Sequence, residues 1–211
     1  MIKILKPLNI NMQEYDPDSL WEVIKTFKKC TLLVTMIFIV SMVSGYLYAN
    51  SNPYESARIM QELSSELGWI TDLDPVLILF AIFLNNAVKS FLVIVLGVLV
   101  IVPIIFIVLN GYILGIVMCE SARTEGLLCV AAAILPHGII ELPMVLLSAA
   151  LGTRVGTMVL LWISGKITTE EILSTLKWSI SFYFRWVLPL LFVAAVIETF
   201  ITPAGMEILK C

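Results

Sequence analysis

TLLVTMIFIVSMVSGYLYA, residues 31–49, decides the fold class, because its nineteen residues include no charged side chain. A helix of about 20 mainly apolar residues is what spans a hydrocarbon core of about 30 Å. Lys25, Lys28 and Lys29 directly precede this stretch. The positive-inside rule assigns such lysines to the cytoplasm, so we predict that the N-terminal segment is cytoplasmic and that the chain first crosses the membrane here.

The composition of the whole chain agrees with this interpretation. Of its 211 residues, 60% are hydrophobic and 14% are charged, whereas a soluble domain carries about 25% charged residues. No cluster of Lys and Arg is interleaved with aromatic residues, which excludes nucleic acid as a partner. We therefore expect an all-α fold, a polytopic transmembrane bundle of about five spans, in the lipid bilayer of the cell membrane.

Three parts are predicted along the chain. Residues 1–30 form a cytoplasmic amphipathic segment, residues 31–201 form the transmembrane bundle, and residues 202–211 form a C-terminal tail on the outer side. Within the bundle, residues 50–74 carry five acidic side chains against one arginine. Their apolar residues recur at helical spacing, so we predict a short amphipathic helix that lies on the outer face.

The next apolar stretch is too long for one crossing. Residues 75–119 would form a helix of roughly 67 Å, which is more than twice the thickness of a hydrocarbon core. The chain must turn back either at Gly97–Pro103, giving two full spans, or at Asn85-Asn86 with Lys89, giving a re-entrant segment and one span. We favour the first turn, and the sequence leaves open whether residues 75–89 span or re-enter.

The C-terminal half is predicted to contain an irregular span and an interfacial helix. Residues 127–151 are apolar but contain Pro136 and Pro143, so we expect a kinked or broken helix. Residues 168–171 have the Ser/Thr-x-x-Glu form of a capping box, which predicts the start of an amphipathic helix at the membrane interface. A final span is expected over residues 182–201.

His137 and Glu141 are the sharpest candidates for a functional site. They are four residues apart, which places them on one face of a helix inside a membrane segment. Ionisable groups at this depth mark an ion or proton path, a ligand site, or a hydrogen bond that holds the bundle together, and these alternatives stay open. The pair supplies two ligands where a zinc site needs three or four, so metal and cofactors remain unassigned.

A second polar set consists of Asn85, Asn86, Lys89 and Asn110. Asparagines often join transmembrane helices through hydrogen bonds, which is the structural alternative to a role in binding. We expect this set to meet His137 and Glu141 inside the bundle, where the ammonium group of Lys89 would neutralise the carboxylate of Glu141.

The cysteines and three of the arginines are not expected to form a functional site. Neither CxxC nor Cys/His spacing occurs, so all four cysteines are expected to be ordinary thiols: Cys30, Cys119, Cys129 and Cys211. Three arginines are expected to extend toward the membrane interface: Arg58, Arg154 and Arg185. Neither a Gly-x-Ser-x-Gly nucleophile elbow nor a Gly-rich phosphate loop occurs, so the sequence gives little support to catalysis.

Four motifs, in order, carry a family resemblance: Phe83-Leu84-Asn85-Asn86-Ala87, Asn110-Gly111-Tyr112-Ile113-Leu114-Gly115, Leu135-Pro136-His137-Gly138-Ile139-Ile140-Glu141-Leu142-Pro143 and Ala149-Ala150-Leu151-Gly152. The chain resembles the stage II sporulation protein M family of bacterial and archaeal membrane proteins over about residues 30–201. The core Pro136-His137-Gly138-x-x-Glu141-x-Pro143 is the most specific element. The resemblance implies the helical membrane fold and the importance of the motif positions, Gly111 included, but it implies no substrate.

Three functions are open at this point. The namesake of the family resembles a membrane scaffold for peptidoglycan-degrading partners, and our leading hypothesis is a non-enzymatic scaffold or assembly component of a membrane complex. Gly152-x-x-x-Gly156 has the spacing of a helix-packing motif, which predicts a homodimer beside contacts with other membrane proteins. The rival is a transporter or channel-like protein that uses the polar cluster as a substrate or ion site. An intramembrane metal-dependent hydrolase is the third hypothesis.

Overall fold

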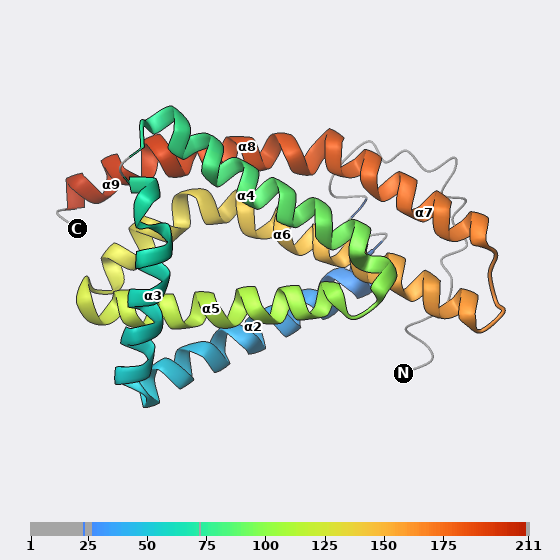
Figure 1. Ribbon diagram of the computed structural model, residues 1–211, viewed down its shortest axis with the longest axis horizontal. Helices are drawn as coiled ribbons and strands as arrows, with labels where there is room; N and C mark the ends of the chain where they lie inside the picture. The colour runs from blue at the N-terminus through green and yellow to red at the C-terminus, as the bar shows by residue number, and fades with distance from the viewer. Residues whose placement is uncertain (1–22, 24–26, 72, 210–211) are drawn as a thin grey trace.

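A computed structural model describes residue 23, residues 27–71 and residues 73–209 (Figure 1). Every element within these residues is helical, and five helices are long and apolar enough to cross a membrane. This confirms the predicted all-α fold class. The amphipathic segment predicted in residues 1–30 lies almost entirely outside the described part of the chain.

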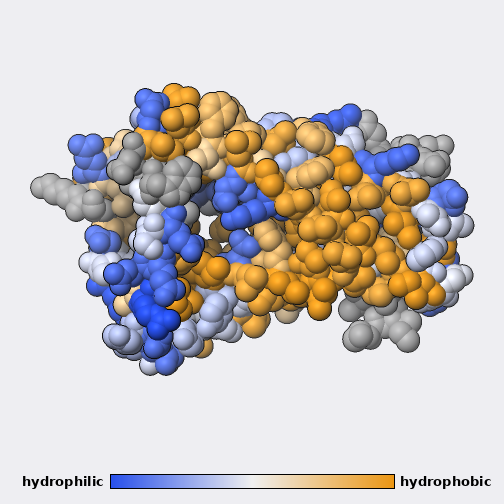
Figure 2. All heavy atoms as spheres, viewed as in Figure 1, coloured by the Kyte–Doolittle hydropathy of each residue, from blue (hydrophilic) through white to orange (hydrophobic). Residues whose placement is uncertain are grey.

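The first two helices define the long axis of the bundle and one of its ends. Helix α2 (Lys28–Ser51) begins within the group of lysines that precedes the first predicted span, and it contains all of the charge-free residues 31–49. Helix α3 (Pro53–Thr71) crosses the end of the bundle at a steep angle to α2 (Figure 1). Hydrophilic side chains gather at this end and again at the opposite end, while hydrophobic side chains form a broad band between them on the visible face (Figure 2). The short amphipathic helix predicted in residues 50–74 is therefore present.

Helices α4 and α5 are two separate helices, each long and apolar enough to cross a membrane. Helix α4 (Pro75–Val95) starts at an Asp74 cap, whose carboxylate accepts a hydrogen bond of 2.9 Å from the backbone N–H of Val76. It continues without interruption through both asparagines, so the re-entrant alternative is wrong. The reversal falls in the 3₁₀ turn η2 (Leu96–Leu99) and the two residues after it, before α5 (Val102–Thr124) begins.

The turn between these two spans has a backbone reason. Val100 adopts a left-handed conformation with φ of 60°, which an α-helix does not allow. Pro103 then lies in the first turn of α5, where its missing N–H costs no hydrogen bond. The turn needs no polar side chain, because 3₁₀ and backbone hydrogen bonds such as Val100 N–H to Gly97 O, at 2.8 Å, satisfy its polar groups.

Helix α6 (Leu127–Ile163) is the central element of the bundle, with 37 residues. It contacts α2, α4, α5, α7 and α8, and its side chains Ala149, Leu151 and Val155 are completely buried. The helix runs unbroken through Pro136 and Pro143 but bends strongly in its first half (Figure 1). Of the predicted alternatives, kinked or broken, the structure shows the kinked helix, which also extends further than the expected span.

The last 41 residues of the helical region form one long irregular helix. It comprises α7 (Thr169–Phe182), the π-helical turn η3 (Tyr183–Val187), α8 (Leu188–Val196), a second π-helical turn η4 (Ile197–Ile201) and α9 (Thr202–Leu209). The capping box is present: Glu171 N–H donates to Thr168 Oγ1, and Thr168 N–H donates to the Glu171 carboxylate at 2.8 Å. The interfacial helix and the final span, predicted as separate elements, are thus continuous.

Glycines allow the backbones of α4, η2 and α6 to touch. A methyl group added to Gly152 would lie within about 3 Å of the carbonyl group of Val93, and one added to Gly156 would lie 2.9 Å from the carbonyl oxygen of Gly97. The Gly152-x-x-x-Gly156 motif is therefore used inside the chain. It gives no support to the homodimer that was predicted from it.

We expect the substitution Gly152→Ala to lower stability, because its methyl group has no space against the backbone of α4. Overpacking of this kind costs about 1–3 kcal/mol. Thermal unfolding in detergent should show a melting temperature several degrees below that of the wild type. Gly205→Ala is the matched control, since no atom lies within 4 Å of the added methyl group. Equal melting temperatures for Gly152→Ala and wild type would contradict the close packing.

Candidate functional site

A polar pocket of about 190 Å³ lies among α4, α5 and α6. Apolar side chains form part of its wall, including Phe38 of α2. Figure 2 shows a hollow with hydrophilic side chains around it, between the α3 end and the hydrophobic band. The polar residues that line the pocket are Asn85, Asn86, Lys89, Ser90, Asn110 and Glu141.

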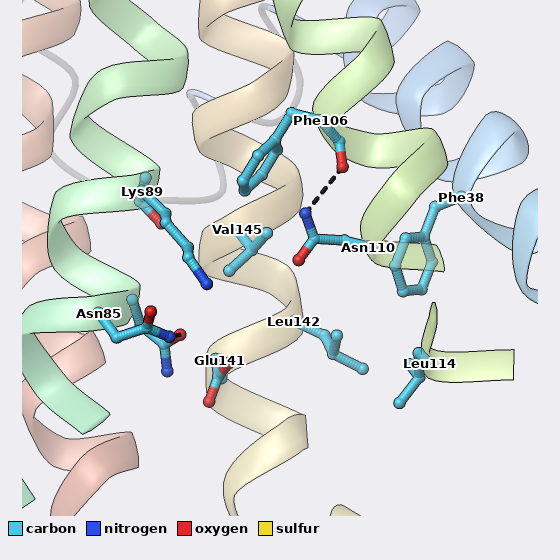
Figure 3. A pocket seen from close by; sticks show the side chains of 11 residues that line it. Phe38, Asn85, Lys89, Phe106, Asn110, Leu114, Glu141, Leu142 and Val145 are labelled. Carbon is cyan, nitrogen blue, oxygen red and sulfur yellow. Dashed lines mark hydrogen bonds between the residues drawn. The ribbon is translucent and has the colours of Figure 1, made fainter. Parts of the chain in front are cut away.

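Helix α4 supplies most of the polar groups. Asn85 and Lys89 are separated by one helical turn and are both exposed, and their side chains point toward Glu141 (Figure 3). The Asn85 amide donates to the Asn86 side-chain oxygen at 3.3 Å. The structure brings Lys89 and Glu141 into one pocket, although they are too far apart for an ion pair among the described residues.

Asn110 of α5 faces the same space from the opposite side. Its Nδ2 donates to the backbone carbonyl of Phe106, one turn earlier, at 2.8 Å (Figure 3). This hydrogen bond lies within α5, so it does not join two helices as the structural interpretation of the asparagines supposed. The carboxamide oxygen of Asn110 points toward the pocket (Figure 3).

His137 and Glu141 lie on one face of α6, where a third ionisable residue joins them. Glu198 comes from the π-helical turn η4, and the possible ligand atoms of these three side chains all lie within 4.8 Å of one another. His137 does not line the pocket, whereas Glu141 belongs to both groups. Sequence reasoning missed Glu198, because no sequence pattern links it to residues about 60 positions earlier.

Four further motif residues, Gly111, Pro136, Gly138 and Pro143, do not line the pocket. A methyl group added to Gly111 would lie 2.7 Å from the Phe38 carbonyl oxygen, so this glycine permits close packing of α5 on α2. Gly138 is buried in α6, between Pro136 and Pro143. Pro136, Gly138 and Pro143 lie in the first half of α6, where the helix bends.

A polar cluster at the α3 end of the bundle was also missed. The Glu120 carboxylate of α5 accepts hydrogen bonds from the Ser56 hydroxyl of α3 and from the Arg123 guanidinium. Arg123 Nη2 also donates to the backbone carbonyl of Ala49 in α2, at 2.9 Å. Ser56 is completely buried and Glu120 is 8% exposed. The i, i+3 spacing of Glu120 and Arg123 is the one signal in the sequence that could have indicated part of this cluster.

Two further predictions need correction. Arg154 does not reach the interface, because it is 6% exposed within α6, whereas Arg58 and Arg185 are exposed. Cys129 takes part in a disulfide bond and is not an ordinary thiol, while Cys30 and Cys119 are free.

We expect Glu120→Gln to destabilise the protein, because it removes the charge that pairs with Arg123 and one acceptor of a buried cluster. Loss of a partner in such a network costs about 1–3 kcal/mol. Glu62→Gln removes the exposed ion pair with Arg58 and is the control, with an expected change within about 0.5 kcal/mol. Thermal unfolding in detergent measures both variants. Equal melting temperatures for the two would show that the buried cluster contributes no more than a surface pair.

The fold and the site define a polytopic helical membrane protein with a polar pocket among its spans. The sequence profile of the family described as Stage II sporulation protein M matches residues 34–203, and the chain belongs to this family. An uncharacterized protein of Methanocaldococcus jannaschii is 34% identical over 102 residues, which cover 46% of this chain and 54% of that relative. The match thus spans about half the length of the relative. No solved structure matches the chain.

Proposed function

We propose that this protein binds a small polar solute or ion in the pocket and acts as a transporter or channel-like membrane protein. The observation that carries the proposal is the exposure of Asn85, Lys89 and Asn110 around a common hollow formed by different helices. Lipid chains offer no hydrogen bonds, so exposed polar groups at membrane depth require water, a solute or another protein beside them.

The positions of these residues along their helices support a location inside the hydrocarbon region. Lys89 lies 14 residues after the start of α4 and six before its end, or roughly 21 Å and 9 Å along the helix axis. Asn110 lies eight residues after the start of α5 and 14 before its end, or roughly 12 Å and 21 Å. Neither side chain is close enough to a helix end to belong to a surface loop.

The chemistry of the pocket suits a solute with both donors and acceptors. Lys89 supplies positive charge and hydrogen-bond donors, Glu141 supplies acceptors, and the asparagines supply both. Figure 3 shows the Lys89 ammonium group and the Asn110 amide on opposite sides of the space above Glu141. The bend of α6 beside this site resembles the irregular helices that form binding sites near the bilayer midplane in many transporters.

Assembly with another membrane protein, the function favoured by the sequence, is the second candidate. The same exposure of Asn85, Lys89 and Asn110 favours it, because a partner helix with polar side chains would satisfy them as water does. The resemblance of the family's namesake to a scaffold points in this direction too. Accessibility to water distinguishes the two candidates.

We expect Lys89→Cys and Asn110→Cys to react with a membrane-impermeant thiol reagent from an aqueous side of proteoliposomes. The background carries Cys30→Ser and Cys119→Ser, which removes the thiols that are free in the described part of the chain. Leu109→Cys is the matched control, since Leu109 is exposed at the same depth of α5 but is absent from the pocket lining and should stay unmodified. Labelling is measured by mass spectrometry of the intact chain.

Two results would count against transport. If Lys89→Cys and Asn110→Cys resist the reagent from both sides, the pocket is sealed from water and the transporter proposal fails. If both react in the purified chain but are protected in native membranes where a second membrane protein co-purifies in fixed ratio, assembly explains the polar surface better. Reaction in native membranes as well would support solute access.

A further inference from the structure

We infer that His137, Glu141 and Glu198 form a binding site for a divalent transition-metal cation of the Zn²⁺ class. This inference goes beyond the proposed function, because metal binding at these residues does not require that a solute enters the pocket. It rests on the geometry of three side chains from two helices and on the charge that they bring into the membrane.

The three side chains are close enough to share one ion. Their possible ligand atoms all lie within 4.8 Å of one another. Zinc binds nitrogen and oxygen ligands at about 2.0–2.2 Å, so tetrahedral ligands are about 3.4 Å apart. Closing these separations by up to about 1.4 Å, within the rotational freedom of the glutamate side chains, brings the three ligands to that spacing.

The helices place the three side chains where they could bind one metal ion together. His137 and Glu141 are separated by four residues on α6, the same spacing that places two ligands on one helix face in zinc proteases. Glu198 lies in the π-helical turn η4, and π turns occur frequently at functional sites. The wide turn is closed by the Thr202 hydroxyl, which donates to the Ile197 carbonyl oxygen at 3.3 Å.

Electrostatics gives the second argument. Glu141 lies 14 residues, or roughly 21 Å, from the start of α6, so two carboxylates and an imidazole, all half-buried, meet well away from this helix end in an apolar bundle. Charges in such surroundings are costly unless they are paired or bind a metal. His137 Nδ1 is buried without a hydrogen-bond partner in the described structure. A divalent cation would neutralise the negative charges of both carboxylates, and the imidazole nitrogen of His137 would coordinate it.

Three protein ligands would leave a coordination position for water or another oxygen ligand. Because Glu141 also lines the polar pocket, the ion would lie next to the space that we assign to a solute. The chemistry of one imidazole and two carboxylates suits Zn²⁺ and related first-row ions better than Ca²⁺, which prefers six or more oxygen ligands.

Metal content tests the inference directly. The full chain is purified in mild detergent with a tag free of histidine, stripped with a chelator, incubated with ZnCl₂ and desalted, and its zinc is measured by elemental mass spectrometry. We expect about one zinc ion per wild-type chain and at least a tenfold loss in His137→Ala and Glu198→Gln. Glu207→Gln, which changes an exposed glutamate of the neighbouring α9, is the matched control and should keep the wild-type zinc content.

A second readout guards against misfolded variants. CoCl₂ in place of ZnCl₂ should give the wild type visible absorption of a nitrogen- and oxygen-coordinated Co²⁺ ion, which a merely structural histidine would not produce. The inference is overturned if monodisperse wild-type protein binds no more zinc than Glu198→Gln and shows no such absorption. Zinc content is independent of thiol labelling at Asn110→Cys, so a failed metal site and a sealed pocket give different results.

Discussion

The bundle depends on the backbone contact between α6 and the end of α4 with its following turn. Gly152 and Gly156 let the backbones of these two segments of one chain approach closely, and this contact constrains the rotation and the height of α6. Glu141 lies 11 residues before Gly152, about three helical turns away, so its direction is determined by the same contact. The meeting of Glu141 with Asn85 and Lys89 of α4 is therefore a consequence of glycine packing further along the same two helices.

Much of the fold could be predicted because the bilayer limits what a chain can form. Residues 31–49 identify a span by length alone, and the capping box at Thr168 identifies a helix start by local hydrogen bonding. The apolar run of residues 75–119 was too long for one span, so a turn had to be placed within it. The turn predicted near Gly97–Pro103 is confirmed, because α4 continues through Asn85 and Lys89. These polar residues face a pocket and do not interrupt the helix, which the sequence did not reveal.

The parts that could not be predicted depend on contacts between distant segments. Glu198 lies in a π-helical turn beside His137 of α6, and no sequence pattern indicates that turn or its neighbour. Burial of Arg154 and the use of Ser56 as a donor to Glu120 depend likewise on which helices become neighbours. The same limit applies to Gly152-x-x-x-Gly156: the spacing indicates close helix contact, but it does not say whether the partner helix belongs to the same chain.

The length of α6 has a consequence for how the protein responds to its membrane. A straight helix of 37 residues would extend about 55 Å, whereas the hydrocarbon core is about 30 Å thick, and a tilt within the usual range of up to about 40° does not remove the difference. The bend in the first half of α6 accommodates part of it (Figure 1). Because Glu141 lies between Pro136 and Pro143, we expect a change in bilayer thickness that alters the bend to reorient its carboxylate as well. Lipid chain length would then influence the geometry of the polar site.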